Sequence, residues 1–219
     1  YEEYLVKVIT KLKSFTRKLI MKKVITCLIF DDFETLDLFG VVEVFGRLPD
    51  IYHCQFVSLK GGLITSSQNV QIHTQSIKDD SLSTDILLIV GGKGTRMLVN
   101  DRAFLTVLKQ YCEKAEFVLS VCTGSALLAK TGLLDGKSAT SNKLAWQWVT
   151  EQSTQVNWIG KARWVVDGKY YSSAGVSAGM DMAYGFIADR HGIDIARQKA
   201  KEIEYYWNED KNEDSFFTA

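Results

Sequence analysis

Short apolar segments recur along the sequence and are separated by stretches of helical length. Each segment is rich in valine, isoleucine, leucine and phenylalanine, which is typical of strands buried on both faces. Strands that alternate with helices form right-handed crossovers and a mostly parallel sheet, with reactive groups gathered beyond the carboxyl ends of the strands. We therefore predict an α/β fold with strands at 24–30, 54–59, 86–90 and 117–121.

Cys122 follows the last of these strands directly, and the small residues Thr123, Gly124, Ser125 and Ala126 then open an apolar-periodic helix. A sharp strand-to-helix turn needs small neighbours, which is the pattern of a nucleophile elbow. The N–H groups and partial positive charge at a helix N-terminus favour thiolate over thiol. We predict Cys122 to be the reactive nucleophile, with a lowered pKa, rather than a small buried residue.

A glycine cluster, Gly91-Gly92-Lys93-Gly94, follows the strand at 86–90. It matches neither the GxGxxG nor the GxxxxGK[ST] pattern, so it gives little support to a nucleotide site. Backbone N–H groups in this loop would suit an oxyanion near the elbow, whereas the alternative is a tight turn without chemical function. No bound cofactor is predicted.

Five acidic residues follow the first strand and compete for the role of acid or base: Asp31, Asp32, Glu34, Asp37 and Glu43. Asp37 is flanked by Leu36, Leu38 and Phe39 in a helical context, so it is the carboxylate most exposed to desolvation and a raised pKa. Asp31 and Asp32 have the character of turn and cap residues. Asp37 is the preferred candidate.

No histidine is placed to pair with the cysteine. His53 and His73 lie in or near expected strands, and His191 lies at a helix end beside Gly192. A Cys-His dyad is therefore not visible, and the spacing of metal ligands is absent, so we predict no metal site.

Composition excludes several classes of function. The 26 Lys and Arg residues balance the 26 Asp and Glu residues, so no overall field favours nucleic acid or an anionic membrane. The four cysteines are widely spaced and include no CxxC pair, which favours a reducing, cytoplasmic compartment. No apolar run approaches the length of a membrane span, and no secretory signal is visible, so we expect a soluble protein without stable membrane insertion.

The chain divides into a basic amphipathic N-terminal extension, 1–21, and a single domain, 22–219, with no linker or repeat to mark a further boundary. Asp167-Gly168 between β-branched and aromatic residues predicts a two-residue hairpin turn. Two helices are expected at 178–190 and 194–207, followed by an acidic, solvated surface segment.

Five pieces of the sequence, in order, resemble the ThiJ/PfpI superfamily of class I glutamine amidotransferase-like fold. They are FDDFETLDLFGVVEVF, LLIVGGKGTR, SVCTGSALLAKTGLLDGKSAT, SAGVSAGMDMAYGF and EIEYYWNEDKNEDSF, and the resemblance covers about residues 22–217. It implies a flavodoxin-like three-layer sandwich with helices on both faces of the sheet. The Leu36-Asp37 pair and the Cys122-Thr123-Gly124 triplet look most like isonitrile hydratases, which add water to R–N≡C to give an N-substituted formamide.

The resemblance implies roles for particular residues. Cys122 would be the nucleophile, Asp37 the acid/base and Thr123 its helper, while Gly91, Gly92 and the Thr123 backbone N–H would bind substrate or developing negative charge. It also implies a homodimer. Protease-like members carry histidine directly after the cysteine, and Thr123 in that place argues against peptidase activity. Many hydratase-like members have histidine and tryptophan where this chain has Asn142-Lys143, so its substrate pocket differs from theirs.

Other functions for the same cysteine remain open. Glyoxalase and deglycase relatives usually carry glutamate where Asp37 stands. A redox-sensing or stress protein would use Cys122 as an oxidisable thiol that forms a sulfinate, and a ligand-binding relative would have no catalysis. Some relatives are sensor halves of transcription regulators, but the remaining chain is too short for an appended helix-turn-helix domain. We therefore expect a small-molecule substrate and no direct binding to nucleic acid.

Overall fold

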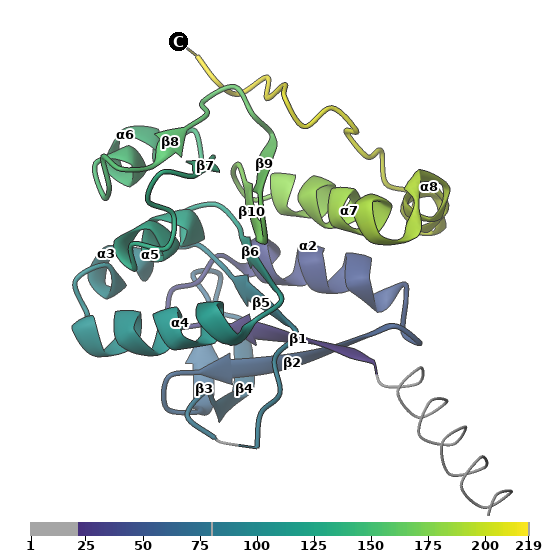
Figure 1. Ribbon diagram of the computed structural model, residues 1–219. Coiled ribbons are helices and arrows are strands. Elements are labelled where there is room, and N and C mark those ends of the chain that lie inside the picture. The colour runs from purple at the N-terminus through teal and green to yellow at the C-terminus, as the bar shows by residue number, and fades with distance from the viewer. Residues whose placement is uncertain (1–21, 80, 219) are drawn as a thin grey trace, which may run out of the picture.

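The computed structural model describes residues 22–79 and 81–218 as an α/β sandwich around an eight-stranded sheet (Figure 1). The strand order is β3-β4-β2-β1-β5-β6-β10-β9, and only the two edge pairs, β3 with β4 and β9 with β10, are antiparallel. The strands are β1 Lys23–Leu28, β2 Tyr52–Ser58, β3 Gly62–Thr65, β4 Gln71–Ser76, β5 Ile86–Ile89, β6 Phe117–Ser120, β9 Trp164–Asp167 and β10 Tyr170–Ser173.

Helices cover both faces of the sheet, which gives the three layers (Figure 1). One layer holds α2 Thr35–Gly46, α7 Ala178–His191 and α8 Ile193–Glu202, and the other holds α3 Thr95–Leu98, α4 Arg102–Lys114 and α5 Gly124–Lys130. A small outlying unit contains β7 Ser138–Ala139, α6 Trp146–Thr150 and β8 Asn157–Trp158. The predicted α/β, flavodoxin-like fold is confirmed.

The register of the central strands positions the site. All four residues of β5 are buried, and β5 pairs with β6 in parallel so that Ile89 lies opposite Ser120. The loop that begins at Val90 therefore emerges beside the loop that carries Cys122. This arrangement is stable because β5 and all but the first residue of β6 are buried.

The four predicted strands appear within two residues of their expected ends. The hairpin also forms, but Tyr170 pairs with Asp167, so its two turn residues are Gly168 and Lys169 rather than Asp167 and Gly168. Gly168 supplies the positive φ, +60°, that this turn requires.

The last predicted helix was too long, because α8 ends at Glu202 instead of residue 207. Glu204 has a φ of +55°, which is incompatible with a continuing helix. Beyond it, the Tyr205 hydroxyl and the Trp207 indole N–H donate to the Asp181 side chain and carbonyl, at 2.9 and 3.1 Å. These tertiary hydrogen bonds turn the chain back onto α7.

The predicted basic extension, 1–21, lies outside the described residues. Among the described residues, none of the helices has the length and apolar character needed to cross a bilayer.

Gly124 offers a test of the packing at the strand-to-helix turn. A Cβ at this position would lie 2.5 Å from the Ile89 carbonyl oxygen and 2.8 Å from that of Val90. We predict that Gly124→Ala lowers the free energy of unfolding by about 1–3 kcal/mol, measured by urea denaturation, because the helix must move away from β5. The control is Gly46→Ala in α2, where a Cβ meets nothing within 4 Å. Equal stabilities of the two variants would contradict the packing described.

Candidate active site

Cys122 occupies the tight turn between β6 and α5 in a strained backbone conformation, with a φ of +55°. Its side chain is buried, with a relative exposure of 6%. Its N–H donates to the Ala174 carbonyl at 3.1 Å, and its carbonyl accepts from the Ser125 and Ser141 hydroxyls at 3.0 and 2.8 Å. A strained residue persists only where its surroundings hold it on several sides, as these three hydrogen bonds do.

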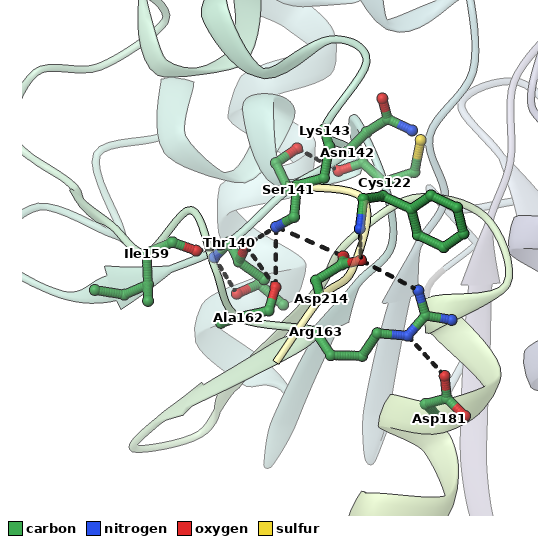
Figure 2. Close-up of polar contacts among 12 residues, drawn as sticks. Cys122, Thr140, Ser141, Asn142, Lys143, Ile159, Ala162, Arg163, Asp181 and Asp214 are labelled. Atoms are coloured by element: carbon green, nitrogen blue, oxygen red, sulfur yellow. Dashed lines mark hydrogen bonds and ion pairs between the residues drawn. The ribbon is translucent and has the colours of Figure 1, made fainter. Parts of the chain in front are cut away.

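Three hydrogen-bond donors face the sulfur and favour its thiolate form. They are the backbone N–H groups of Val176 and Thr123 and the side chain of Asn142, each of which lowers the pKa of Cys122. Figure 2 shows the Asn142 amide beside the sulfur. Val176 is itself strained, with a φ of +36°, which is rare for a β-branched residue. The backbone is thus held in an unfavourable conformation beside the sulfur.

Burial and the nearby Asp37 carboxylate nevertheless raise the pKa of Cys122 to about 12. The prediction that the helix N-terminus lowers the pKa of Cys122 is therefore wrong. The physical reason is that removal of water disfavours the thiolate more than the three donors favour it. The resting form of Cys122 at neutral pH is the thiol.

Asp37 lies in the first turn of α2 and is fully buried. Its Oδ2 accepts from the Gly91 N–H at 2.8 Å, while Oδ1 has no hydrogen-bond partner among the described residues. Burial raises the pKa of Asp37 to about 7, and the contacts with Gly91 and with the Cys122 thiol oppose that rise. A buried carboxyl that titrates near neutrality is suited to proton transfer.

Gly91 allows this close approach. A Cβ on Gly91 would lie 2.6 Å from the Thr123 nitrogen and 2.8 Å from the Asp37 Oδ2. The loop, the elbow and α2 therefore meet at a point that only glycine can occupy.

The glycine amides have partners that the sequence did not reveal. The Gly91 N–H donates to Asp37, and the Gly92 N–H donates to the Thr123 hydroxyl at 3.0 Å. The Thr123 hydroxyl also lies 3.2 Å from the Thr95 hydroxyl. The amides that face the sulfur are those of Thr123 and Val176, so Gly91 and Gly92 instead position the acid and the threonine.

The other carboxylates considered from the sequence lie in different surroundings. The Asp31 Oδ1 accepts from the Thr65 N–H at 2.9 Å, as a turn residue does. Glu34 accepts from Gln68 at 3.1 Å, and Glu43 forms an ion pair with Arg47. Asp32 is exposed.

The histidines also take no part in the site. His191 forms a 2.7 Å hydrogen bond with the Tyr52 hydroxyl, and His53 and His73 are exposed. Within the described ranges, no group of three or more His, Cys, Asp or Glu side chains is arranged to hold a metal ion.

A buried cluster of four charged residues lies behind the site, and we refer to Lys143, Arg163, Asp181 and Asp214 as the ion cluster (Figure 2). Arg163 donates to Asp181 at 2.8 Å, and both cations lie 3.8 Å from Asp214. Two positive and two negative charges balance, so the cluster holds no uncompensated charge.

The ion cluster supports two of the donors at the sulfur. Lys143 directly follows Asn142 and donates to the Thr140 hydroxyl and the Ala162 carbonyl, at 2.8 and 2.9 Å (Figure 2). Arg163 donates to the hydroxyl of Ser177, the residue after Val176, at 3.2 Å. The cluster therefore ties together the two loops that carry Asn142 and Val176.

No pattern in the sequence indicates a role for Val176, Arg163 or Asp214, and Asn142 stands out only as a departure from the hydratase pattern. Residues 208–213 are exposed, as expected for the acidic tail, but Asp214 is buried. The sequence did hold a signal for Asn142, because this residue lies just beyond the family-like segment SVCTGSALLAKTGLLDGKSAT. No local signal distinguishes Asp214 from its acidic neighbours.

The strand order and the elbow define a flavodoxin-like α/β protein with a cysteine at the carboxyl end of a central strand. The sequence profile of the DJ-1/PfpI family matches residues 22–189. The chain belongs to the DJ-1/PfpI family, as the sequence motifs predicted.

Among curated relatives, the isonitrile hydratase of Pseudomonas putida is 32% identical over 179 residues, which cover 81% of this chain and 76% of the relative. The HTH-type transcriptional regulator GbdR of Pseudomonas aeruginosa is 26% identical over 178 residues, 77% of this chain, but the chain spans only 47% of the regulator. Similarity therefore extends both to an enzyme and to part of a transcriptional regulator.

Solved structures show the same fold. A ThiJ/PfpI family protein from Pseudomonas syringae superposes with a TM-score of 0.76 at 25% identity, covering 85% of this chain and 76% of the other. Drosophila melanogaster DJ-1beta superposes with a TM-score of 0.73 at 20% identity, covering 85% of this chain and all of the other.

The buried Asp37 predicts a particular dependence of stability on pH. Its folded pKa of about 7 lies above its ordinary value of 3.8, so its stabilising contribution is present at low pH and is lost as the pH rises through 7. Between pH 5 and pH 7.5, the wild type should lose about 2–3 kcal/mol of unfolding free energy relative to Asp37→Asn. Urea denaturation at several pH values measures this difference. Asp50→Asn, at an exposed site, is the control, and parallel curves for wild type and Asp37→Asn would contradict the assignment.

The ion cluster predicts that Asp214→Asn is destabilising. It leaves two buried cations with one carboxylate, and we expect the free energy of unfolding to fall by about 2–4 kcal/mol. The matched control is Glu213→Gln, which removes the same charge from the exposed neighbour and should change stability by less than about 0.5 kcal/mol. The measurement is guanidinium denaturation of the wild type and the two variants. Equal changes in the free energy of unfolding for both variants would exclude a supporting role for Asp214.

Proposed function

We propose that the protein is a cysteine-dependent enzyme that adds water to a small electrophilic molecule, with an isonitrile as the substrate class. The observation that carries the proposal is the placement of the Cys122 thiol beside a buried Asp37 carboxyl with a pKa of about 7. Support comes from the similarity to an isonitrile hydratase over 81% of the chain.

The reaction begins with Cys122 as a thiol and Asp37 as a carboxylate, the combination that dominates between pH 7 and pH 12. The sulfur attacks the terminal carbon of R–N≡C while Asp37 accepts the thiol proton. Asp37 then delivers that proton to the same carbon, which gives the thioimidate R–N=CH–S–Cys122. Proton transfer during bond formation removes the need for a free thiolate.

Hydrolysis completes the cycle. Water adds to the thioimidate carbon, with Asp37 relaying a proton to the nitrogen, and the tetrahedral intermediate R–NH–CH(OH)–S–Cys122 forms. The C–S bond then breaks, the formamide R–NH–CHO leaves, and the sulfur regains a proton. One water is consumed and no oxidant or reductant is required. The N–H groups of Thr123 and Val176 and the Asn142 amide stabilise negative charge on sulfur as it attacks and leaves.

We further place the enzyme in the cytoplasm as a homodimer. The four cysteines are free thiols in the structure, which suits a reducing compartment. The dimer follows from the family resemblance.

A second candidate is a ligand-sensing domain without turnover. The similarity to part of GbdR favours it, because about half of that regulator corresponds to this chain. A redox sensor receives less support, since a thiol with a raised pKa is oxidised slowly.

The test is formamide production from neutral isonitriles such as cyclohexyl isocyanide. We expect Cys122→Ala to abolish turnover and Asp37→Asn to reduce kcat by about 10²–10⁴-fold, because the proton relay is lost. In the wild type, kcat/KM should rise with pH through about 7 as Asp37 ionises and show no alkaline decline below pH 10. Saturable binding of an isonitrile with no turnover would favour the sensing domain, and full activity of both variants would refute the mechanism.

A further inference from the structure

An arginine that the proposed mechanism does not use lies next to the site. The guanidinium carbon of Arg96, in α3, lies 3.4 Å from the centroid of the Trp148 ring in α6. This cation–π contact restricts the position of the guanidinium, whose N–H groups reach only the Thr95 hydroxyl, at 3.5 Å, among the described residues. Arg96 is exposed, whereas Trp148 is half-buried.

The contact between Arg96 and Trp148 joins α3 and α6, the helices that follow the two loops flanking Cys122. Arg96 follows the glycine loop by two residues, and Trp148 is six residues beyond Asn142. An Arg96 N–H lies 3.5 Å from the Thr95 hydroxyl, which lies 3.2 Å from the Thr123 hydroxyl. A short polar chain thus leads from the guanidinium to the residue after Cys122. Burial lowers the pKa of Arg96, and the negative charge that Cys122 carries when it is ionised opposes that lowering.

Arg96 has no carboxylate within ion-pair distance among the described residues. Arg47, Arg163 and Arg197 each form an ion pair within the chain. A guanidinium held over an aromatic ring, without a carboxylate partner among the described residues and linked through Thr95 to Thr123, is arranged to receive a planar anion.

We propose that Arg96 binds the carboxylate of the substrate, so that the site prefers small electrophiles that carry a carboxylate near the reacting carbon. The identity of the electrophile rests on the proposed hydratase function, but the anion site does not. Arg96 is a specificity residue, and Trp148 positions it through the cation–π contact.

Alkylation of Cys122 tests the anion site without any assumption about the natural reaction. Iodoacetate and iodoacetamide react alike: the sulfur forms a bond to the CH₂ carbon and iodide leaves. They are similar in shape, but only iodoacetate carries a carboxylate. Peptide mass spectrometry gives the rate constant for alkylation of Cys122 by each reagent. The ratio of the two rate constants reports an anion site beside the sulfur, because a change in thiol reactivity affects both reagents equally.

We expect Arg96→Gln to lower the iodoacetate-to-iodoacetamide ratio by about tenfold, as loss of a charge-assisted contact implies. The matched control is Arg102→Gln, which removes an exposed arginine that contacts no aromatic ring within the described part of the chain and should change the ratio by less than about twofold. A decrease of less than threefold for Arg96→Gln, or an equal decrease in both variants, would overturn the proposal. If Arg96 only stabilised the thiolate, both reagents would slow together and the ratio would stay constant.

Hydration of isocyanoacetate and its methyl ester extends the test to turnover. For the wild type, we expect kcat/KM to be higher for isocyanoacetate than for its methyl ester. Arg96→Gln should lower kcat/KM for isocyanoacetate and change kcat/KM for the ester by less than about twofold, so that the preference is lost. An unchanged preference would overturn the proposal. If the wild type hydrates neither compound nor the neutral isonitriles, the proposed function fails, whereas the alkylation ratio still decides whether Arg96 binds an anion.

Discussion

The site depends on the burial of an acid and a thiol at one point, where the carboxyl ends of β5 and β6 meet the first turn of α2. Removal of water raises the pKa values of both Asp37 and Cys122, to about 7 and about 12. The pair is therefore arranged to exchange a proton within a reaction rather than to hold a permanent thiolate. Gly91 makes this possible, because any side chain there would separate the carboxylate from the elbow.

The remaining structure holds the other groups around that pair. The ion cluster lies outside the central sheet, yet it joins the loops of Asn142 and Val176, two of the three donors at the sulfur. Its negative charge comes partly from Asp214, near the end of the described chain, so the C-terminal segment contributes to the geometry around Cys122. An ion network of this kind fixes one arrangement of the loops, because any other leaves a buried charge without a partner.

Local sequence patterns predicted the central strands, the elbow and the burial of Asp37. Apolar runs indicate the strands and the surroundings of Asp37, and the small residues after Cys122 indicate the elbow. These patterns missed the β3–β4 hairpin, whose strand Gln71–Ser76 is polar and largely exposed, and they extended α8 beyond Glu202. They also assigned a lowered pKa to Cys122, because a helix N-terminus is visible in a sequence whereas the depth of burial is not. The role of Asp214 could not be predicted either, because it follows from contacts with Arg163 and Lys143, which lie 51 and 71 positions away in the sequence.

In the proposed mechanism, Cys122 forms a covalent bond to the carbon that water later attacks. Rapid mixing of the protein with an isonitrile, acid quench and intact-protein mass spectrometry test it most directly. We expect a transient species heavier by the mass of one isonitrile, mapped to Cys122, that appears before the formamide and is absent in Cys122→Ala. Formamide production with no such species at any quench time, or an adduct that persists unchanged in Cys122→Ala, would contradict it.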